Sequence, residues 1–274
     1  GAVPTLINVT ISNNTASSNG GAVWTVGAGP TFENCTITGN TAYGDGMGGT
    51  FWLMGVGNTS LTDCLINENT VPYATAGIWA MSTEALHLNR VTIAGNSGEW
   101  NPGVFISDGF GNGDYTPATL TNCTITGNSS SNGGALRATY GGHYSIINSI
   151  IYDNNTPYQV SLYQGSAGIS YSDIENGWEG EGNIDADPLF NEDYTLLEGS
   201  PCIDSGDPNL WYEDLDATSS DMGATGGLFV LPNFTNHDFG EVGDIGSSIQ
   251  FSVYSNLGIN VVFIAKFFNF KQSF

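Results

Sequence analysis

The chain has 274 residues, of which 40% are apolar, and it contains 38 glycines. Only four Lys and Arg residues stand against 27 Asp and Glu residues, so the formal net charge is −23 at pH 7. This charge repels phosphate backbones and anionic lipid, which excludes nucleic acid as an expected partner. No run of eighteen apolar residues occurs, so we expect no membrane insertion.

The sequence begins to repeat itself almost at once, at intervals of roughly 23 to 32 residues. Six segments align without gaps and a seventh aligns more weakly. They are LINVTISNN from Leu6, FENCTITGN from Phe32, LTDCLINEN from Leu61, LNRVTIAGN from Leu88, LTNCTITGN from Leu120, IINSIIYDN from Ile146 and ISYSDIENG from Ile169. A fixed period of this length is typical of solenoids.

One isoleucine occupies the same place in every segment, and Val, Cys or Ser lies two residues before it. The isoleucines are Ile11, Ile37, Ile66, Ile93, Ile125, Ile151 and Ile174. A spacing of two residues puts both positions on one face of a strand. Mostly polar residues lie between and after them, so each segment predicts a strand with an apolar inside and a polar outside.

Three residues after the isoleucine, at the predicted turn, an asparagine recurs. The six are Asn14, Asn40, Asn69, Asn96, Asn128 and Asn154. Asparagine tolerates the left-handed backbone of such a turn. Its side-chain amide also pairs with the same amide one coil further on, so we expect an internal asparagine ladder.

A second strand opens six to nine residues later with small residues, as in GGAVW from Gly20 and GGTFW from Gly48. Its predicted inward line is Val23, Phe51, Trp79, Phe105 and Leu136. One position further on, the expected outward row is Trp24, Trp52, Ala80, Ile106 and Arg137. In this alignment Ala80 and Ile106 interrupt the row.

These patterns predict an all-β chain whose residues 1–183 form a right-handed parallel β-helix of about seven coils. Strands stacked in register on the next coil bury one continuous core and pair every edge but the terminal ones. A β-sandwich or a propeller would need antiparallel hairpins with tight turns. The gapless alignment from coil to coil favours parallel stacking instead.

The acidity is concentrated after the coils, with nine acidic residues before residue 168 and eighteen from there to residue 244. We assign residues 184–227, which include DADPLFNEDYTLLEGSPCIDSGDP from Asp185, to an acidic cap that closes the helix. Residues 228–274 are assigned to an incomplete immunoglobulin-like module, because the segment is too short for a seven-stranded sandwich.

The coil repeats resemble the right-handed β-helix, pectin-lyase-like superfamily, and especially bacterial surface proteins. The cap segment is similar to the terminal element of "choice-of-anchor" proteins, and LPNFTNHDFGEVGDIGSSIQFSVYSNLG is similar to the start of immunoglobulin-like modules of the ASPM, SPD-2 and hydin type. The resemblance implies a secreted or cell-surface bacterial protein, of which this chain is a monomeric module. It does not imply catalysis, because such folds host enzymes, adhesins and stalks alike.

Residues suited to catalysis are few. A polysaccharide lyase needs a base and cations near the uronate carboxylate, yet the coils hold only Arg90 and Arg137 with His87 and His143. A glycoside hydrolase needs two carboxyl groups on one face, for which Asp108 and Asp114 are the candidates, with Glu99 nearby. No pair recurs at a telling spacing, and solvated loop carboxylates are the commoner case.

Ligand-binding candidates are the aromatic residues Trp24, Trp52 and Trp100, together with Arg137. If Trp24 and Trp52 point outward, the two indoles form a ledge suited to stacking on sugar rings. The competing interpretation is that they pack against a loop. Outward threonine pairs, Thr36 with Thr38 and Thr124 with Thr126, suit ice binding, although strand propensity explains them as well.

Two further features concern metals and cysteines. Alternating aspartates across the cap have the oxygen chemistry that Ca²⁺ prefers, although solvated turn residues are the competing interpretation. They are Asp204, Asp207, Asp214, Asp216 and Asp221. Cys35 and Cys64 stack on neighbouring coils at a separation that suits a disulfide, but inward cysteines more often act as small buried hydrophobes.

The function that these observations favour is a non-catalytic extracellular surface module, either a stalk or an adhesin-like domain that contacts a polysaccharide or a surface glycan, with no cofactor other than Ca²⁺. The alternative is a carbohydrate-active enzyme, a lyase or a hydrolase, with its cleft in the loops around residues 97–118.

Overall fold

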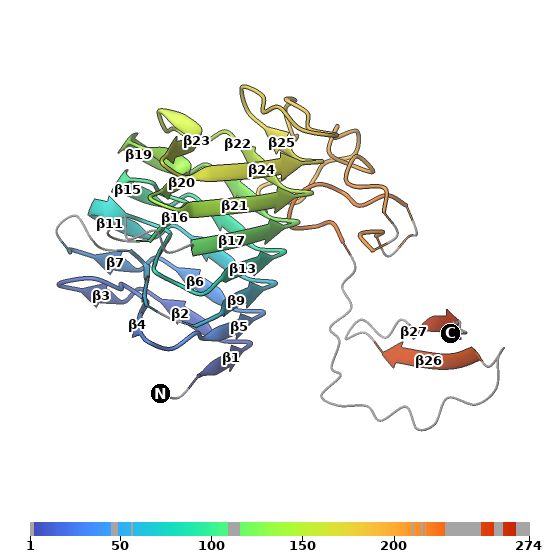
Figure 1. The fold of residues 1–274 in the computed structure, drawn as a ribbon, viewed down its shortest axis with the longest axis horizontal. Coiled ribbons are helices and arrows are strands. Elements are labelled where there is room, and N and C mark those ends of the chain that lie inside the picture. The colour runs from blue at the N-terminus through green and yellow to red at the C-terminus, as the bar shows by residue number, and fades with distance from the viewer. Residues whose placement is uncertain are drawn as a thin grey trace, which may run out of the picture. The chain divides into compact units, whose positions relative to one another are not determined.

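The computed structural model describes residues 3–44, 49–55, 57–108, 116–209, 211–214, 216, 218–227, 248–254 and 260–266. The chain divides into two compact units, Gly1–Gly227 and Leu228–Phe274. In the first unit the described strands form four parallel sheets that run along the stacked coils (Figure 1). Successive coils supply one strand to each sheet, which makes the fold a right-handed parallel β-helix and confirms the predicted fold class.

The four sheets are named by their order along one coil. The first contains β1 (Thr5–Ile7), β5 (Thr31–Glu33), β9 (Thr59–Thr62), β13 (Leu86–Asn89), β17 (Thr116–Thr121), β21 (Gly142–Ile147) and β24 (Ser166–Ser170). The second contains β2 (Thr10–Ser12), β6 (Thr36–Thr38), β10 (Leu65–Asn67), β14 (Thr92–Ala94), β18 (Thr124–Thr126), β22 (Ile150–Tyr152) and β25 (Asp173–Ile174).

The other two sheets are shorter. The third contains β3 (Thr15–Ala16), β7 (Thr41–Ala42), β11 (Thr70–Thr75), β15 (Ser97–Trp100) and β19 (Ser129–Asn132). The fourth contains β4 (Val23–Val26), β8 (Phe51–Met54), β12 (Ile78–Met81), β16 (Val104–Ser107), β20 (Gly134–Thr139) and β23 (Tyr158–Tyr163). In the second unit, β26 (Ser248–Tyr254) pairs antiparallel with β27 (Asn260–Lys266).

The isoleucine column forms the centre of the core. Ile37, Ile66, Ile93 and Ile125 are in register on neighbouring strands of the second sheet, and each is fully buried. Phe32, Leu61, Leu88 and Leu120 form a second buried column on the first sheet. The predicted inward strand face is therefore confirmed.

The asparagine ladder is present along all six predicted positions. Both the backbone N–H and the side-chain Nδ2 of Asn69 donate to Oδ1 of Asn96, at 3.0 and 2.9 Å, and the same pair of bonds links each ladder asparagine to the next. The ladder ends where Asn154 donates to Gln159 at 2.8 Å. Its amides are thus satisfied from coil to coil.

One detail of the ladder prediction is wrong. The left-handed residue of this turn is the one before the asparagine, as at Gly39 (φ +64°), Glu68 (φ +55°) and Gly95 (φ +62°), and the ladder asparagines have no positive φ. The asparagine follows the turn and directs its amide inward, where the ladder forms. A separate left-handed column lies between the first and second sheets, and it includes Asn34, Asp63, Arg90 and Asn122.

The second expectation that the structure corrects concerns the fourth sheet. Its inward line is Val23, Phe51, Ile78, Val104, Leu136 and Val160, because Ile78 pairs with Phe51 and Val104 pairs with Ile78. Trp79 and Phe105 are consequently in the outward row. A shift of one residue moves a strand side chain to the opposite face.

The acidic cap packs against the last coils. Cys202 and Met222 are buried against Ile150 of β22. Asn148 accepts the backbone N–H of Asp207 at 2.7 Å, and Thr124 accepts that of Ala224 at 2.9 Å. Thr124 and Thr126 are both buried, so they do not form an exposed threonine face, which argues against ice binding by this pair.

Candidate functional site

An unbroken aromatic row lies on the outward face of the fourth sheet. Trp24, Trp52, Trp79 and Phe105 are in register on β4, β8, β12 and β16. The Trp24 and Trp52 rings are stacked, with centroids 5.6 Å apart and planes at 6°. Trp52 and Trp79 meet edge to face at 5.9 Å, and Trp79 and Phe105 stack at 6.1 Å. The row that the sequence alignment interrupted is therefore continuous.

The stacking leaves little of this row accessible. Trp24 is 60% exposed, whereas Trp52 is 9% and Trp79 is 6% exposed. Met81 is buried beside them, and Met54 packs against the same cluster. Because the rings pack against one another along the row, the expected two-indole ledge has one accessible member, Trp24.

The structure brings two of the candidate ligand-binding residues together, Trp100 and Arg137. Arg137 follows Phe105 in the outward row, on β20. Its guanidinium carbon lies 5.9 Å from the centroid of the Trp100 ring, at the end of β15, in a cation–π contact. The contact holds the side chain of Arg137 toward the third sheet, and Trp100 remains 39% exposed.

The catalytic candidates are placed differently. Asp108 follows β16 and is 1% exposed, and its carbonyl oxygen accepts the hydroxyl of Ser82 at 2.6 Å. Asp114 lies outside the described residues. His143 is on the first sheet, where its Nδ1 is 2.7 Å from the Ser166 hydroxyl. Of the two carboxylates expected for hydrolysis, the described part of the chain thus contains one, and it is buried.

The sequence placed a cleft in the loops around residues 97–118. The structure has an open groove on the third sheet, with a volume of about 580 Å³, of which residues 97–99 fall within that range and the other lining residues were not anticipated. It is lined by Thr70, Pro72, Ser97, Gly98, Glu99, Ser129, Ser130, Ser131 and Asn155. The signal was present, because polar residues follow each ladder asparagine. Their short runs carried no periodicity that could distinguish a groove from a loop.

A bulge in β11 forms one side of this groove. The register between β11 and β15 shifts between Val71 and Thr75, so residues 72–74 have no ladder partners on that side. Gly98 lies opposite, and a Cβ there would be 2.5 Å from the carbonyl oxygen of Ala74. Only glycine allows this approach. The bulge also presents Tyr73, which is 55% exposed.

The aspartates of the acidic cap accept hydrogen bonds from the cap's own backbone. Asp221 accepts the N–H of Asp204 at 2.9 Å, Asp214 accepts those of Asp221 and Gly227, and Asp207 accepts that of Asn209. Asp216 accepts both the N–H and the hydroxyl of Thr218. Within the described ranges, no three His, Cys, Asp or Glu side chains are grouped as metal ligands.

Burial changes the acidity of two carboxyl groups, Asp221 in the cap and Asp173 of β25, against which the cap packs. It raises the pKa of Asp221 to about 6, with a further rise from the like charges of Asp214 and Asp204. Burial also raises the pKa of Asp173 to about 6, although the N–H of Ala186 and the thiol of Cys202 donate to its carboxylate. Both carboxyl groups therefore hold their proton to a higher pH in the folded chain than an aspartate does in an unfolded chain.

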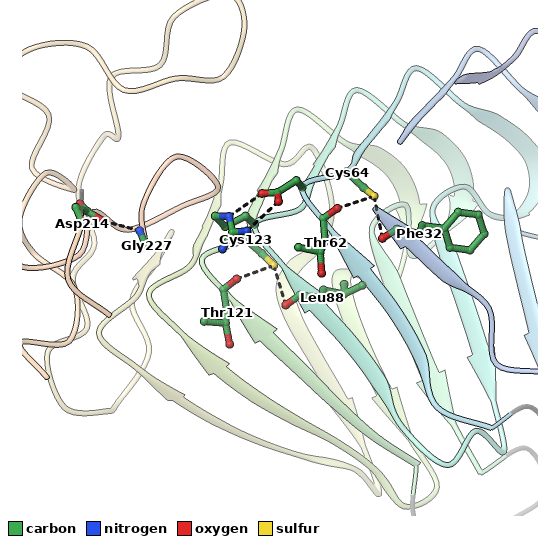
Figure 2. A network of polar contacts seen from close by, with 10 residues as sticks. Phe32, Thr62, Cys64, Leu88, Thr121, Cys123, Asp214 and Gly227 are labelled. Atoms are coloured by element: carbon green, nitrogen blue, oxygen red, sulfur yellow. Dashed lines mark hydrogen bonds and ion pairs between the residues drawn. The ribbon is translucent and has the colours of Figure 1, made fainter. Parts of the chain in front are cut away.

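The four cysteines are buried free thiols. Figure 2 shows Cys64 and Cys123 donating to carbonyl oxygens of their own coil and of the preceding coil. Burial raises the pKa of both thiols to about 12, so neither is a nucleophile near neutral pH. Asp63 and Arg90 form an ion pair across neighbouring coils, in which the Arg90 guanidinium donates to the Asp63 carboxylate at 2.6 and 2.8 Å.

No helix in the described residues is long and apolar enough to cross a membrane. We found no match among curated proteins and none among solved structures. The family described as "Right handed beta helix region" matches residues 5–151, which is more than half of the chain. Those residues carry most of the isoleucine column and five of the six ladder asparagines, and the chain therefore belongs to the right-handed β-helix family.

Proposed function

We propose that this chain is a non-catalytic module of a secreted or cell-surface bacterial protein, a β-helix stalk that contacts a glycan through the groove on its third sheet. The groove lining carries this proposal. It combines hydroxyl, amide and carboxylate groups, with Tyr73 in the adjoining bulge and Trp100 at the end of the strand that supplies Ser97 and Glu99. Hydroxyl hydrogen bonding beside exposed aromatic rings suits a sugar.

The lining also bears on the enzyme alternative. Glu99 is the single carboxylate among the nine lining residues, whereas hydrolysis of a glycosidic bond uses two carboxyl groups that flank the bond. A lyase would need a base beside a uronate, and the lining contains none of Lys, Arg, His or Tyr. The groove is thus better suited to holding a sugar chain than to cleaving it.

A panel of soluble and insoluble polysaccharides tests the proposal. We expect the protein to be retained on at least one of them, with no new reducing ends and no unsaturated products after long incubation. Trp100→Ala should weaken retention, while Trp24→Ala, on the fourth sheet, serves as the matched control. Product release that Glu99→Gln abolishes would establish the enzyme alternative. If no glycan retains the protein, glycan contact is contradicted, and a structural spacer that binds no ligand remains.

A further inference from the structure

The groove on the third sheet repeats the same chemistry from coil to coil. Thr70 pairs in register with Ser97, Ser97 with Ser129, and Ser129 with Asn155. These positions therefore form one column of hydroxyl and amide groups, spaced by the strand separation of about 4.8 Å. The column runs along the axis on which the coils stack.

Further polar groups lie beside this column. Glu99 and Ser131 come two residues further along β15 and β19, and both line the groove together with Ser130. In β11 the bulge interrupts this pattern, so that Pro72 lines the groove, while Val71 is fully buried in a small apolar cluster with Ala42, Ala74 and Ala76. The groove therefore has a largely polar floor that extends over several coils.

This floor discriminates among classes of polymer. An extended peptide would bind by adding a strand, but β11, β15 and β19 already pair with one another through their backbone edges. Polyanions meet a chain of net charge −23, with Glu99 in the groove itself. A neutral polymer rich in hydroxyl groups needs no free strand edge and meets no charge repulsion.

We propose that the groove binds a neutral, unbranched polysaccharide lying along the helix axis, whose successive sugars meet successive coils through Thr70, Ser97, Ser129 and Asn155. This inference rests on the proposed function and specifies its ligand. Tyr73 in the bulge of β11 and Trp100 at the end of β15 are exposed, and they offer ring faces to the sugars. Glu99 accepts hydrogen bonds from sugar hydroxyls and disfavours uronates.

Titration calorimetry with a neutral β-glucan, a neutral galactomannan and polygalacturonate tests this ligand class, using the whole chain. We expect binding to a neutral polymer that is insensitive to salt, because no charge pairing contributes. Ser97→Trp and Ser129→Trp fill the column and should weaken that binding about tenfold or more. Ser145→Trp, at an exposed outward position of β21, is the matched control and should leave binding unchanged.

The outcomes separate this inference from the proposed function. Binding of a neutral glycan that Ser97→Trp and Ser129→Trp leave unchanged would overturn the groove assignment while a glycan-binding module remains. Binding of polygalacturonate alone, lost at high salt, would overturn the neutral class. Binding of no glycan at all, by a chain whose circular dichroism shows it to be folded, would overturn the proposed function itself.

Discussion

The coils and the acidic cap belong to the same compact unit, but they are held together by different interactions. In the coils, two buried apolar columns, one of them made of isoleucines, and an unbroken amide ladder repeat the same contacts in each turn. In the cap, single carboxylates such as Asp214 and Asp221 accept one or two backbone N–H groups each, and Asp173 of β25 accepts the N–H of Ala186 from the cap. The stability of the coils should therefore depend on packing, and that of the cap on pH.

The largest effect is expected from the coil core. Ile93→Ala removes a fully buried side chain from the centre of the column and should lower the free energy of unfolding by about 4 kcal/mol. Urea unfolding followed by circular dichroism measures this loss. Ile11→Ala, at a half-buried position of the first described coil, is the matched control and should cost clearly less. Equal losses would show that the column is not a continuous core.

The ladder gives the next largest effect. Asn96→Ala removes the acceptor for two N–H groups of Asn69 and the donor to the Ile66 carbonyl, all of them buried, so we expect a loss of about 3 kcal/mol. Asn14→Ala, at the exposed end of the ladder, should cost about 1 kcal/mol. Chemical denaturation of both variants measures the change in the free energy of unfolding. An Asn96→Ala variant as stable as the parent chain would mean that water replaces the hydrogen bonds of the ladder.

The cap should respond to pH in the direction opposite to that of ordinary acid denaturation. The pKa of Asp173 in the folded state, about 6, lies above the value of about 3.9 for an unfolded aspartate. The folded state therefore binds more protons between these values, and its stability should fall as the pH rises from about 4 to about 6. Asp221 adds to the same trend.

Hydrogen exchange of cap peptides, corrected for the intrinsic rate at each pH, measures this response. Protection should be greater at the acidic end, and Asp173→Asn should flatten the profile. Asp193→Asn provides the contrast, because hydrogen bonds from Thr195 lower the pKa of Asp193, so its contribution is lost as the pH falls. Protection that increases with pH in the parent chain would contradict the role of Asp173.

The smallest effect concerns the thiols. Iodoacetamide at mildly alkaline pH should leave all four cysteines unmodified in the folded protein and modify all four in urea, because all four are buried and inaccessible to the reagent. Intact mass spectrometry counts the adducts. Rapid modification of Cys202 alone would show that the cap opens independently of the coils.

The elements that the sequence predicted well are those repeated without gaps. In every coil the ladder asparagine follows the inward isoleucine by three residues, as in Ile66 and Asn69. Alignment alone therefore placed each of these residues over its counterpart in the next coil. For the fourth sheet the prediction was wrong at Trp79 and Phe105, which it placed on the inward face. Its strands follow connections of unequal length, and a slip of one residue exchanges inside for outside.

The candidate site was harder to predict than the fold. Trp100 and Arg137 were identified as ligand-binding candidates, but their contact joins two different sheets, and no spacing in the sequence encodes it. The groove depends on a bulge in β11 that Gly98 permits from the next coil. Such a feature arises from the approach of two backbones and leaves only an isolated glycine in the sequence.

The sequence by itself determined the period, the inward isoleucines and the amide ladder, because a solenoid satisfies each residue through its counterpart one period away. Only the tertiary structure decided which tryptophans are accessible, where the third sheet is hollowed, and that the cap aspartates accept their own backbone N–H groups. Those features depend on neighbours whose separation along the chain varies, and a repeat pattern carries no information about them.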